Sequence, residues 1–252
     1  MGAVLRRGRH LIERWAPSDT LGRVLVVAAH PDDVDFGAAG TVAAWTGAGT
    51  EVAYCIVTDG EAGGEDPSIS RAQMASLRRD EQRAAAKEVG VRSVTFLGYP
   101  DGRLEASQAL RRDVTRVVRA FRPQIVLAPS PERWWERIHA SHPDHLAAGE
   151  AATCAVYPDA RNPFAHPELL EEGLQPHSVD ELWLMASGAG NVAVEITGTF
   201  ERKIAALLRH RSQIKDPAGV VQRVRAGAAS AAEEAGMADG ALAEVFRRVT
   251  AR

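Results

Sequence analysis

Short apolar runs alternate with amphipathic helical patterns along most of this chain, and this alternation constrains the fold more than any other feature. The apolar runs are Val24–Ala29, Val52–Val57, Val94–Leu97 and Ile125–Ala128. Between them, the spacing of apolar residues predicts helices over Ala39–Trp45, Arg71–Val89 and Leu110–Phe121. Uniformly apolar runs of this length are typical of buried parallel strands. The pattern predicts an α/β fold, a Rossmann-like layered sheet that is mostly parallel and has helices on both faces.

The second half of the chain predicts an extension of this sheet. Glu181–Ala186 and Val192–Ile196 have the composition of two more strands, and Phe200–Ile214 has the spacing of a helix. Beyond Asp216 we expect two amphipathic helices, over Val220–Glu234 and Ala241–Arg252. The whole predicts one domain over residues 1–252, with a core from about residue 22 to residue 214 and C-terminal helices over 216–252.

Two segments stand outside this pattern. The basic segment Leu5–Trp15 predicts a solvated helix that packs Leu11, Ile12 and Trp15 on the body of the protein. Tyr157–Pro176 is rich in proline and lacks periodicity, which fits either a functional loop or a surface excursion.

Composition and charge exclude several classes of protein. Thirty Lys and Arg residues against 33 Asp and Glu residues give a net charge of −3, which lacks the basic excess of a dedicated nucleic-acid binder. Cys55 and Cys154 form no CxxC pair, so we expect neither a disulfide framework nor a thiolate metal site, and we expect a reducing, cytoplasmic location. No apolar stretch has the roughly 18 residues of a membrane span. A small-molecule substrate is the expected partner.

Polar side chains gather where the first and fourth predicted strands end. His30-Pro31-Asp32-Asp33 follows the first strand, and His142-Pro143-Asp144-His145 follows the fourth. Because parallel strands carry their sites at the carboxyl edge of the sheet, we expect the two motifs to converge. His30 and Asp33 can bind one ion while Asp32 stays unbound, and His145 is the best candidate for the third ligand of a catalytic metal.

A set of two imidazoles and one carboxylate suits Zn²⁺ best, and Fe²⁺, Co²⁺ or Mn²⁺ less exclusively. Asp32, as the free carboxylate, is the candidate general base for a metal-activated water. A protonated His142 is the candidate group that stabilises an oxyanion or protonates a leaving amine. A structural alternative is that each His-Pro-Asp is a turn, with Asp144 capping the helix that follows.

Two other functions fit parts of the pattern. A phosphoesterase would use similar ligands, but such sites usually bring two metals and more carboxylates than this sequence offers. A non-catalytic nucleotide-binding module is suggested by Gly37-Ala38-Ala39-Gly40 at a helix start, although the GxGxxG spacing is absent and the preceding carboxylates would face phosphate.

With these motifs the sequence resembles the zinc-dependent de-N-acetylases of the LmbE-like, or GlcNAc-phosphatidylinositol de-N-acetylase (PIG-L), superfamily. The resemblance spans most of Arg23–Ile214. It rests on Ala29-His30-Pro31-Asp32-Asp33, Thr58-Asp59-Gly60-Glu61, Arg78-Arg79-Asp80-Glu81 and His142-Pro143-Asp144-His145. The common family form reads His-Pro-Asp-Asp-Glu, whereas here Val34 takes the acidic position and Asp35 follows it.

The resemblance implies hydrolysis of an N-acetyl or longer N-acyl group from an amino sugar, most often a glucosamine unit of a larger glycoside. It implies His30, Asp33 and His145 as zinc ligands, Asp32 as general base, His142 at the oxyanion or the amine, and Asp144 orienting His142 or a neighbouring ligand. Arg78 matches the family position that contacts substrate, and Asp101 follows the third strand, where sugar hydroxyls would be bound. His210 either reaches the pocket rim, from this or a neighbouring subunit, or is a packed or surface residue. The resemblance also implies a homo-oligomer.

Within this resemblance the substrate stays open. An amidase of a thiol-conjugated pseudo-disaccharide and a tailoring deacylase of an antibiotic glycoside would share the same motifs.

Overall fold

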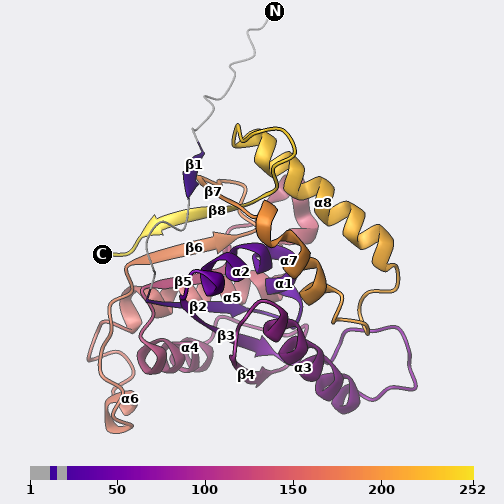
Figure 1. Cartoon of the computed structure of the whole chain (residues 1–252). Coiled ribbons are helices and arrows are strands. Elements are labelled where there is room, and N and C mark those ends of the chain that lie inside the picture. The colour runs from indigo at the N-terminus through magenta and orange to yellow at the C-terminus, as the bar shows by residue number, and fades with distance from the viewer. Residues whose placement is uncertain (1–11, 16–21) are drawn as a thin grey trace, which may run out of the picture.

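One eight-stranded sheet forms the centre of the computed structural model, which describes residues 12–15 and 22–252 (Figure 1). The strand order is β1-β7-β8-β6-β5-β2-β3-β4. Neighbouring strands run parallel, except that β8 is antiparallel to both β6 and β7. The predicted, mostly parallel α/β sheet is therefore confirmed. The strands are β1 (Glu13–Trp15), β2 (Arg23–Ala28), β3 (Glu51–Thr58), β4 (Ser93–Tyr99), β5 (Ile125–Pro129), β6 (Glu181–Met185), β7 (Val192–Glu195) and β8 (Ala243–Thr250).

Helices cover both faces of the sheet. One face packs against α2 (Ala39–Gly47), α3 (Arg71–Glu88), α7 (Phe200–Leu207) and α8 (Pro217–Glu234), and the other against α4 (Gln108–Phe121) and α5 (Pro143–Cys154). The shorter helices are α1 (Asp33–Gly37), α6 (Glu168–Glu171), η1 (Trp135–Ala140), η2 (Ala155–Asp159) and η3 (Thr197–Thr199). No helix in the described ranges has both the length and the apolar character to cross a membrane.

Strand β2 shows why the central runs are uniformly apolar. Val24 and Val26 pack into the hydrophobic cluster on one face, whereas Leu25 and Val27 pack into the cluster on the other. Because successive side chains of a strand point to opposite faces, a strand covered on both sides needs apolar residues at every position.

The predicted helix over Ala241–Arg252 is wrong, because most of this segment is strand β8. Strand β8 lies between β6 and β7 in the sheet. Phe246 is buried and its ring lies 5.6 Å from that of Trp183, centroid to centroid. Val245, Phe246 and Val249 are residue types that favour strands. The C-terminal segment thus completes the sheet and does not end in two helices.

The segment around Trp15 is also different from the prediction. Glu13–Trp15 is strand β1, which pairs in parallel with β7. The Trp15 ring packs edge-to-face on the rings of Trp45 and Trp183, at centroid distances of 5.9 and 5.6 Å. This contact favours an extended segment across the sheet edge over a helix. Residues 5–11 of the predicted helix lie outside the described residues.

The proline-rich segment after α5 lies at the edge of the sheet where β5 begins. The buried Arg119 of α4 donates hydrogen bonds to the backbone carbonyls of Asp159, Ala160, Asn162 and Ala165. His177 contacts the carbonyl of Pro123, two residues before β5, at 2.7 Å. These contacts fix the segment against α4 and the start of β5.

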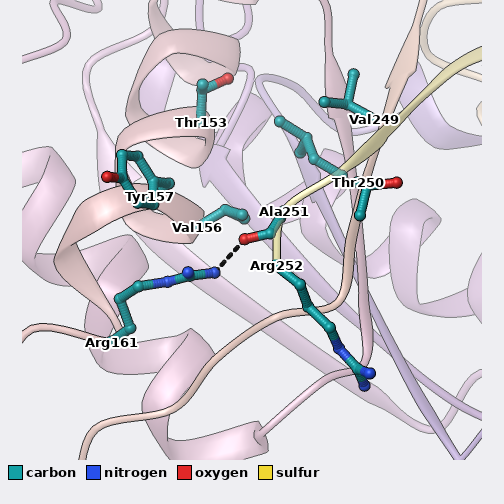
Figure 2. Close-up of a pocket in the computed structure, with 9 residues that line it drawn as sticks. Thr153, Val156, Tyr157, Arg161, Val249, Thr250, Ala251 and Arg252 are labelled. Atoms are coloured by element: carbon teal, nitrogen blue, oxygen red, sulfur yellow. Dashed lines mark hydrogen bonds between the residues drawn. The ribbon is translucent and has the colours of Figure 1, made fainter.

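A pocket of about 590 Å³ lies at this same edge (Figure 2). Its walls come from the end of α5, from η2, from the beginning of β6 and from the last residues of the chain. Thr153 on the α5 wall lies eight residues beyond His145, which is roughly 12 Å along the helix axis. The pocket is therefore separate from the edge where β2 and β5 end.

Candidate metal centre

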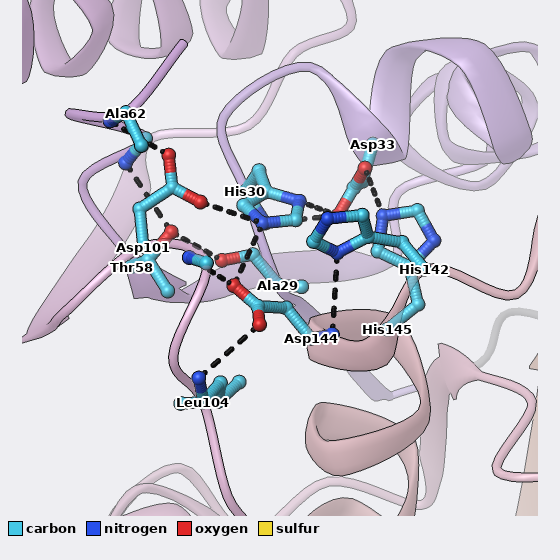
Figure 3. Close-up of polar contacts among 12 residues, drawn as sticks. Ala29, His30, Asp33, Thr58, Ala62, Asp101, Leu104, His142, Asp144 and His145 are labelled. Carbon is cyan, nitrogen blue, oxygen red and sulfur yellow. Dashed lines mark hydrogen bonds and ion pairs between the residues drawn. The ribbon is translucent and has the colours of Figure 1, made fainter.

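The first His-Pro-Asp motif forms the link between β2 and α1. Asp32 adopts a left-handed backbone conformation with φ of 95°, which turns the chain sharply from strand to helix. This turn lets the backbone N–H of His30 donate to Oδ2 of Asp33 at 2.8 Å. The ring of His30 and the carboxylate of Asp33 consequently face the same space (Figure 3).

The second motif begins helix α5. Nδ1 of His142 accepts the backbone N–H of Asp144 at 3.2 Å, so His142 is itself the N-cap residue of the helix. Gly149 allows α5 to lie directly on the end of β5, since a Cβ there would come within 2.3 Å of the Pro129 carbonyl oxygen. Because β2 and β5 are neighbours in the sheet, the two motifs meet at its carboxyl edge.

The three predicted metal ligands are brought together. The ligand atoms of His30, Asp33 and His145 all lie within 4.8 Å of one another. Nε2 of His145 lies 3.0 Å from Oδ1 of Asp33, and Nδ1 of His30 lies 3.6 Å from Oδ2 of Asp33. Two imidazoles and one carboxylate in this arrangement match the donor set of a catalytic zinc.

The outer nitrogen of each imidazole is already held by another group. Nε2 of His30 lies 3.1 Å from Asp101 and 3.2 Å from Asp144, and Nδ1 of His145 lies 3.3 Å from the Ala140 carbonyl oxygen. This is the pattern of metal-ligating histidines, whose second N–H is given to a carboxylate or carbonyl. Nδ1 of His30 and Nε2 of His145 are left for an ion, so the residues present fit a metal.

The electrostatics of the centre follow from these contacts. Burial opposes a charge on His30, yet its hydrogen bonds to Asp101 and Asp144 raise its pKa to about 12. Burial also acts to raise the pKa of Asp33, but the charge and hydrogen bond of His145 hold it well below its ordinary value. Asp33 is thus an anion that faces two imidazoles, an arrangement that favours a bound cation.

Asp32 lies beside this set and is held by helix α3. Nη2 of Arg78 donates to its Oδ2 at 3.1 Å, and Oε1 of Gln82 accepts its backbone N–H at 2.8 Å. Burial, and then the charge of Asp33, raise the pKa of Asp32 to about 6 against the opposing charge of Arg78. A carboxylate near this pKa is well matched to accept a proton at neutral pH.

Two predicted residues, Asp101 and Asp144, lie behind His30. Asp101 is buried, and besides His30 its carboxylate accepts the backbone N–H of Ala62 at 2.9 Å. Asp144 is also buried and accepts the backbone N–H groups of Gly102 and Leu104 at 2.7 and 3.1 Å. Of the two roles implied for Asp144, its side-chain contact is with the ligand His30. Asp101, which is expected to bind sugar hydroxyls, thus contacts the same predicted ligand, His30.

The other two residues expected to contact substrate are buried as well. Arg78 is 4% exposed and donates to the carbonyls of Gly60 and Pro31 besides Asp32. His210 is fully buried, and its Nε2 lies 2.7 Å from Oδ2 of Asp35. Helix α7 ends at Leu207 rather than at the predicted Ile214, and the following turn carries His210 inward instead of to the rim.

Gln82 also supports the site, although the sequence motifs do not point to it. It is fully buried, and it lies four residues after Arg78 on the same face of α3. That spacing could have found it, since residues four apart on a helix point the same way. Its Nε2 donates to Asp35 at 3.0 Å, so Asp35 has a supporting contact although it is displaced from the usual acidic position.

Comparisons with known proteins bear on this geometry. The GlcNAc-PI de-N-acetylase (PIG-L) family matches residues 25–156, more than half of the chain. A diacetylchitobiose deacetylase from Thermococcus kodakarensis is 32% identical over 204 residues, covering 79% of this chain and 73% of the relative. A probable N-acetyl-α-D-glucosaminyl L-malate deacetylase 2 from Bacillus anthracis is 29% identical over 197 residues, covering 75% and 80%.

A solved structure extends the likeness to three dimensions. The N,N'-diacetylchitobiose deacetylase of Pyrococcus horikoshii, solved with an inhibitor, superposes with a TM-score of 0.84 at 32% identity. The match covers 92% of this chain and 85% of that one. The predicted resemblance is confirmed, and this chain belongs to the GlcNAc-PI de-N-acetylase (PIG-L) family.

Proposed function

We propose that this chain is a metal-dependent hydrolase that removes the N-acetyl group from an amino sugar, with an N-acetylglucosamine unit of a larger glycoside as its substrate. The predicted reaction class, amide hydrolysis on N-acetylated sugars, is confirmed by the family and by its deacetylase relatives. The observation that carries the proposal is the convergence of His30, Asp33 and His145. Beside them lies the carboxylate of Asp32, which is not one of the three predicted metal ligands.

We propose zinc as the metal, held by His30, Asp33 and His145. When bound, it would act as a Lewis acid on the amide carbonyl and lower the pKa of a water molecule toward 7. Asp32 is placed to take the proton of that water. Arg78 holds the Asp32 carboxylate from behind at one oxygen only, so the other stays free to accept a hydrogen bond.

His142 is the candidate donor to the oxyanion. Because its Nδ1 accepts a backbone N–H, the neutral ring carries its proton on Nε2. Burial and the neighbouring positive charge of His30 lower the pKa of His142, which favours this neutral form. His142 is exposed, so its Nε2–H can reach a substrate. Of the two roles predicted for His142, a hydrogen bond to the developing oxyanion fits this ring better than a proton transfer to the amine.

The named substrates of the relatives support an N-acetylglucosamine unit. Diacetylchitobiose and N-acetylglucosaminyl malate differ in what is attached to the sugar but share that unit. In this chain Trp135 is 75% exposed on the η1 turn that precedes His142; the Arg133 guanidinium lies over its ring at 5.6 Å, which leaves the other face to stack on a sugar.

A homo-oligomer and a cytoplasmic location remain predictions. Light scattering of the purified protein tests the first, and a strictly monomeric mass would contradict it.

The experiment that tests the proposed function combines metal analysis with an assay of free amine. The purified protein is incubated with N-acetylglucosamine, diacetylchitobiose and N-acetylglucosaminyl inositol, and released amine is quantified. About one zinc per chain together with amine release is the expected result. A chain that binds no metal after reconstitution would overturn the mechanism, and a metal-loaded chain that releases no amine from any of the three would overturn the proposed substrate unit.

A further inference from the structure

The general-base candidate Asp32 stands in a backbone conformation that its residue type rarely adopts. Its φ of 95° lies in the left-handed region, where a Cβ makes unfavourable contacts. Such a conformation persists only where the surroundings impose it. The direction of the Asp32 carboxylate depends on this backbone turn, so whatever holds the turn also aims the carboxylate.

The peptide bond between Pro31 and Asp32 is held at its carbonyl by Arg78, at 2.6 Å, and at its N–H by Gln82. Oε1 of Gln82 accepts the backbone N–H of Asp32 at 2.8 Å, while its Nε2 donates to Oδ2 of Asp35 at 3.0 Å. The amide has only one orientation that satisfies both contacts, since a backbone N–H only donates and a carboxylate only accepts. Gln82 is fully buried, so water does not substitute for either contact.

Asp35 and His210 fix Gln82 in turn. Oδ2 of Asp35 also lies 2.7 Å from Nε2 of His210, and both residues are fully buried. Two N–H groups thus converge on one carboxylate oxygen. This chain of hydrogen bonds runs from His210, in the turn after α7, to Asp35 in α1, then to Gln82 in α3 and finally to the backbone of Asp32.

We propose that Gln82 is a positioning residue for the deacetylation reaction, acting through the backbone of Asp32, and that Asp35 and His210 orient it. This inference rests on the proposed function, because it assigns Asp32 as the base. It also separates Gln82 from the metal, since its hydrogen bonds go to Asp32 and Asp35 and not to His30, Asp33 or His145.

The test begins with Gln82→Met, which keeps the side-chain length and removes both hydrogen bonds. A misplaced catalytic group costs up to about 100-fold in rate. We expect kcat to fall about 10- to 100-fold, with KM and metal content within about twofold of the wild type. Gln222→Met, at an exposed glutamine of α8, is the matched control and should leave all three values unchanged.

A double-mutant cycle distinguishes positioning from general support of the fold. If Gln82 acts through Asp32, then Gln82→Met should lower kcat by less than about twofold when Asp32→Asn is already present. A full 10- to 100-fold loss in that background would overturn the proposal, as would a loss of metal that matches the loss of kcat.

Asp35 provides a second pair of variants should Gln82→Met fold poorly. Asp35→Asn keeps an oxygen that can accept from Gln82 and His210, and kcat should stay within about threefold of the wild type. Asp35→Leu removes that oxygen and should resemble Gln82→Met. Equal losses for the two variants would overturn the hydrogen-bonding role.

A measurement that needs no activity separates this inference from the proposed function. Hydrogen exchange of the Asp32 amide, followed by NMR, should be at least tenfold faster in Gln82→Met than in the wild type. If the metal-loaded wild type releases no amine, the proposed function fails while this exchange still tests the contact. An unchanged exchange rate would overturn the positioning role.

Discussion

At the residue scale, we expect His30, Asp33 and His145 to hold the ion and Asp32 to take a proton. His30→Ala, Asp33→Ala and His145→Ala each remove a ligand atom from the set, and we expect these variants to lose both metal and amine release. Asp32→Asn keeps a partner for Arg78 and leaves the ligands in place. It should retain the metal and lose about 10²- to 10⁴-fold in kcat, the usual contribution of a general base. Metal analysis beside kcat checks this, and equal metal content in all four variants would contradict the assignment.

The two cysteines differ in environment, which predicts different reactivities. Cys55 is fully buried, and burial raises the pKa of its thiol to about 12. Cys154 is partly exposed, and its thiol also has a raised pKa, first from burial and then from Glu150. We expect a thiol reagent at pH 8 to label Cys154 slowly and to leave Cys55 unlabelled in the folded protein. Cys154→Ser should abolish the labelling, whereas labelling that persists in this variant would show that Cys55 is accessible.

Residue roles were predictable where spacing alone decides them. The two His-Pro-Asp motifs follow strands of one parallel sheet, and this was enough to bring His30, Asp33 and His145 together. Arg78, Asp101 and His210 were expected to face the substrate, and all three are buried. Spacing along a helix or loop does not show which way a side chain points, because that depends on what packs above it from elsewhere in the chain.

At the scale of elements, β8 is anchored to α2, the second helix after β2. Its Glu244 accepts the backbone N–H groups of Gly40 and Thr41 in the first turn of α2, at 3.1 and 2.8 Å. Lys203 of α7 donates to the same carboxylate at 2.7 Å and to the Phe36 carbonyl at 2.6 Å. A strand added from the end of the chain is thereby joined to α1, α2 and α7 in one buried network.

This anchoring gives a prediction for stability. Glu244→Ala leaves the charge of Lys203, which is 2% exposed, without its partner, and removal of one member of a buried pair costs about 3–5 kcal/mol. Urea unfolding should show this loss in the free energy of unfolding. Glu201→Ala breaks the exposed pair with Arg225 and is the control that should unfold like the wild type. Similar midpoints for both variants would show that the buried pair stabilises little.

The same network explains why β8 was not recognised from sequence. The strands β2, β3 and β5 can be predicted from their uninterrupted apolar residues, which they need because helices cover both of their faces. Strand β8 contains Glu244, Arg247 and Arg248, a mixture that also suits an amphipathic helix. Its state is decided by β6 and β7, which lie about 50 residues or more earlier in the chain, and by Lys203 from α7. Local patterns carry no information about such distant partners.

At the scale of the whole molecule, the predicted metal ligands lie outside the hydrophobic core. The two hydrophobic clusters lie on the two faces of the sheet, whereas the predicted ligands lie at its carboxyl edge: His30 after β2, Asp33 at the start of α1 and His145 in the first turn of α5. We therefore expect the fold to persist when the metal is removed, unlike that of a protein built around a closed structural zinc site.

Metal removal tests this separation of core and site. After dialysis against a chelator we expect amine release to disappear, while the far-UV circular dichroism spectrum and the urea m-value stay at their original values. The free energy of unfolding should fall only by the ligand-linkage term, roughly 4 kcal/mol when free metal is at about 1,000 times its Kd, and the urea midpoint should fall accordingly. Added zinc should restore both the midpoint and the activity. Loss of cooperative unfolding in the metal-free protein would instead show that the ion holds the β2–α1 and β5–α5 turns together, and that the carboxyl edge of the sheet folds only around it.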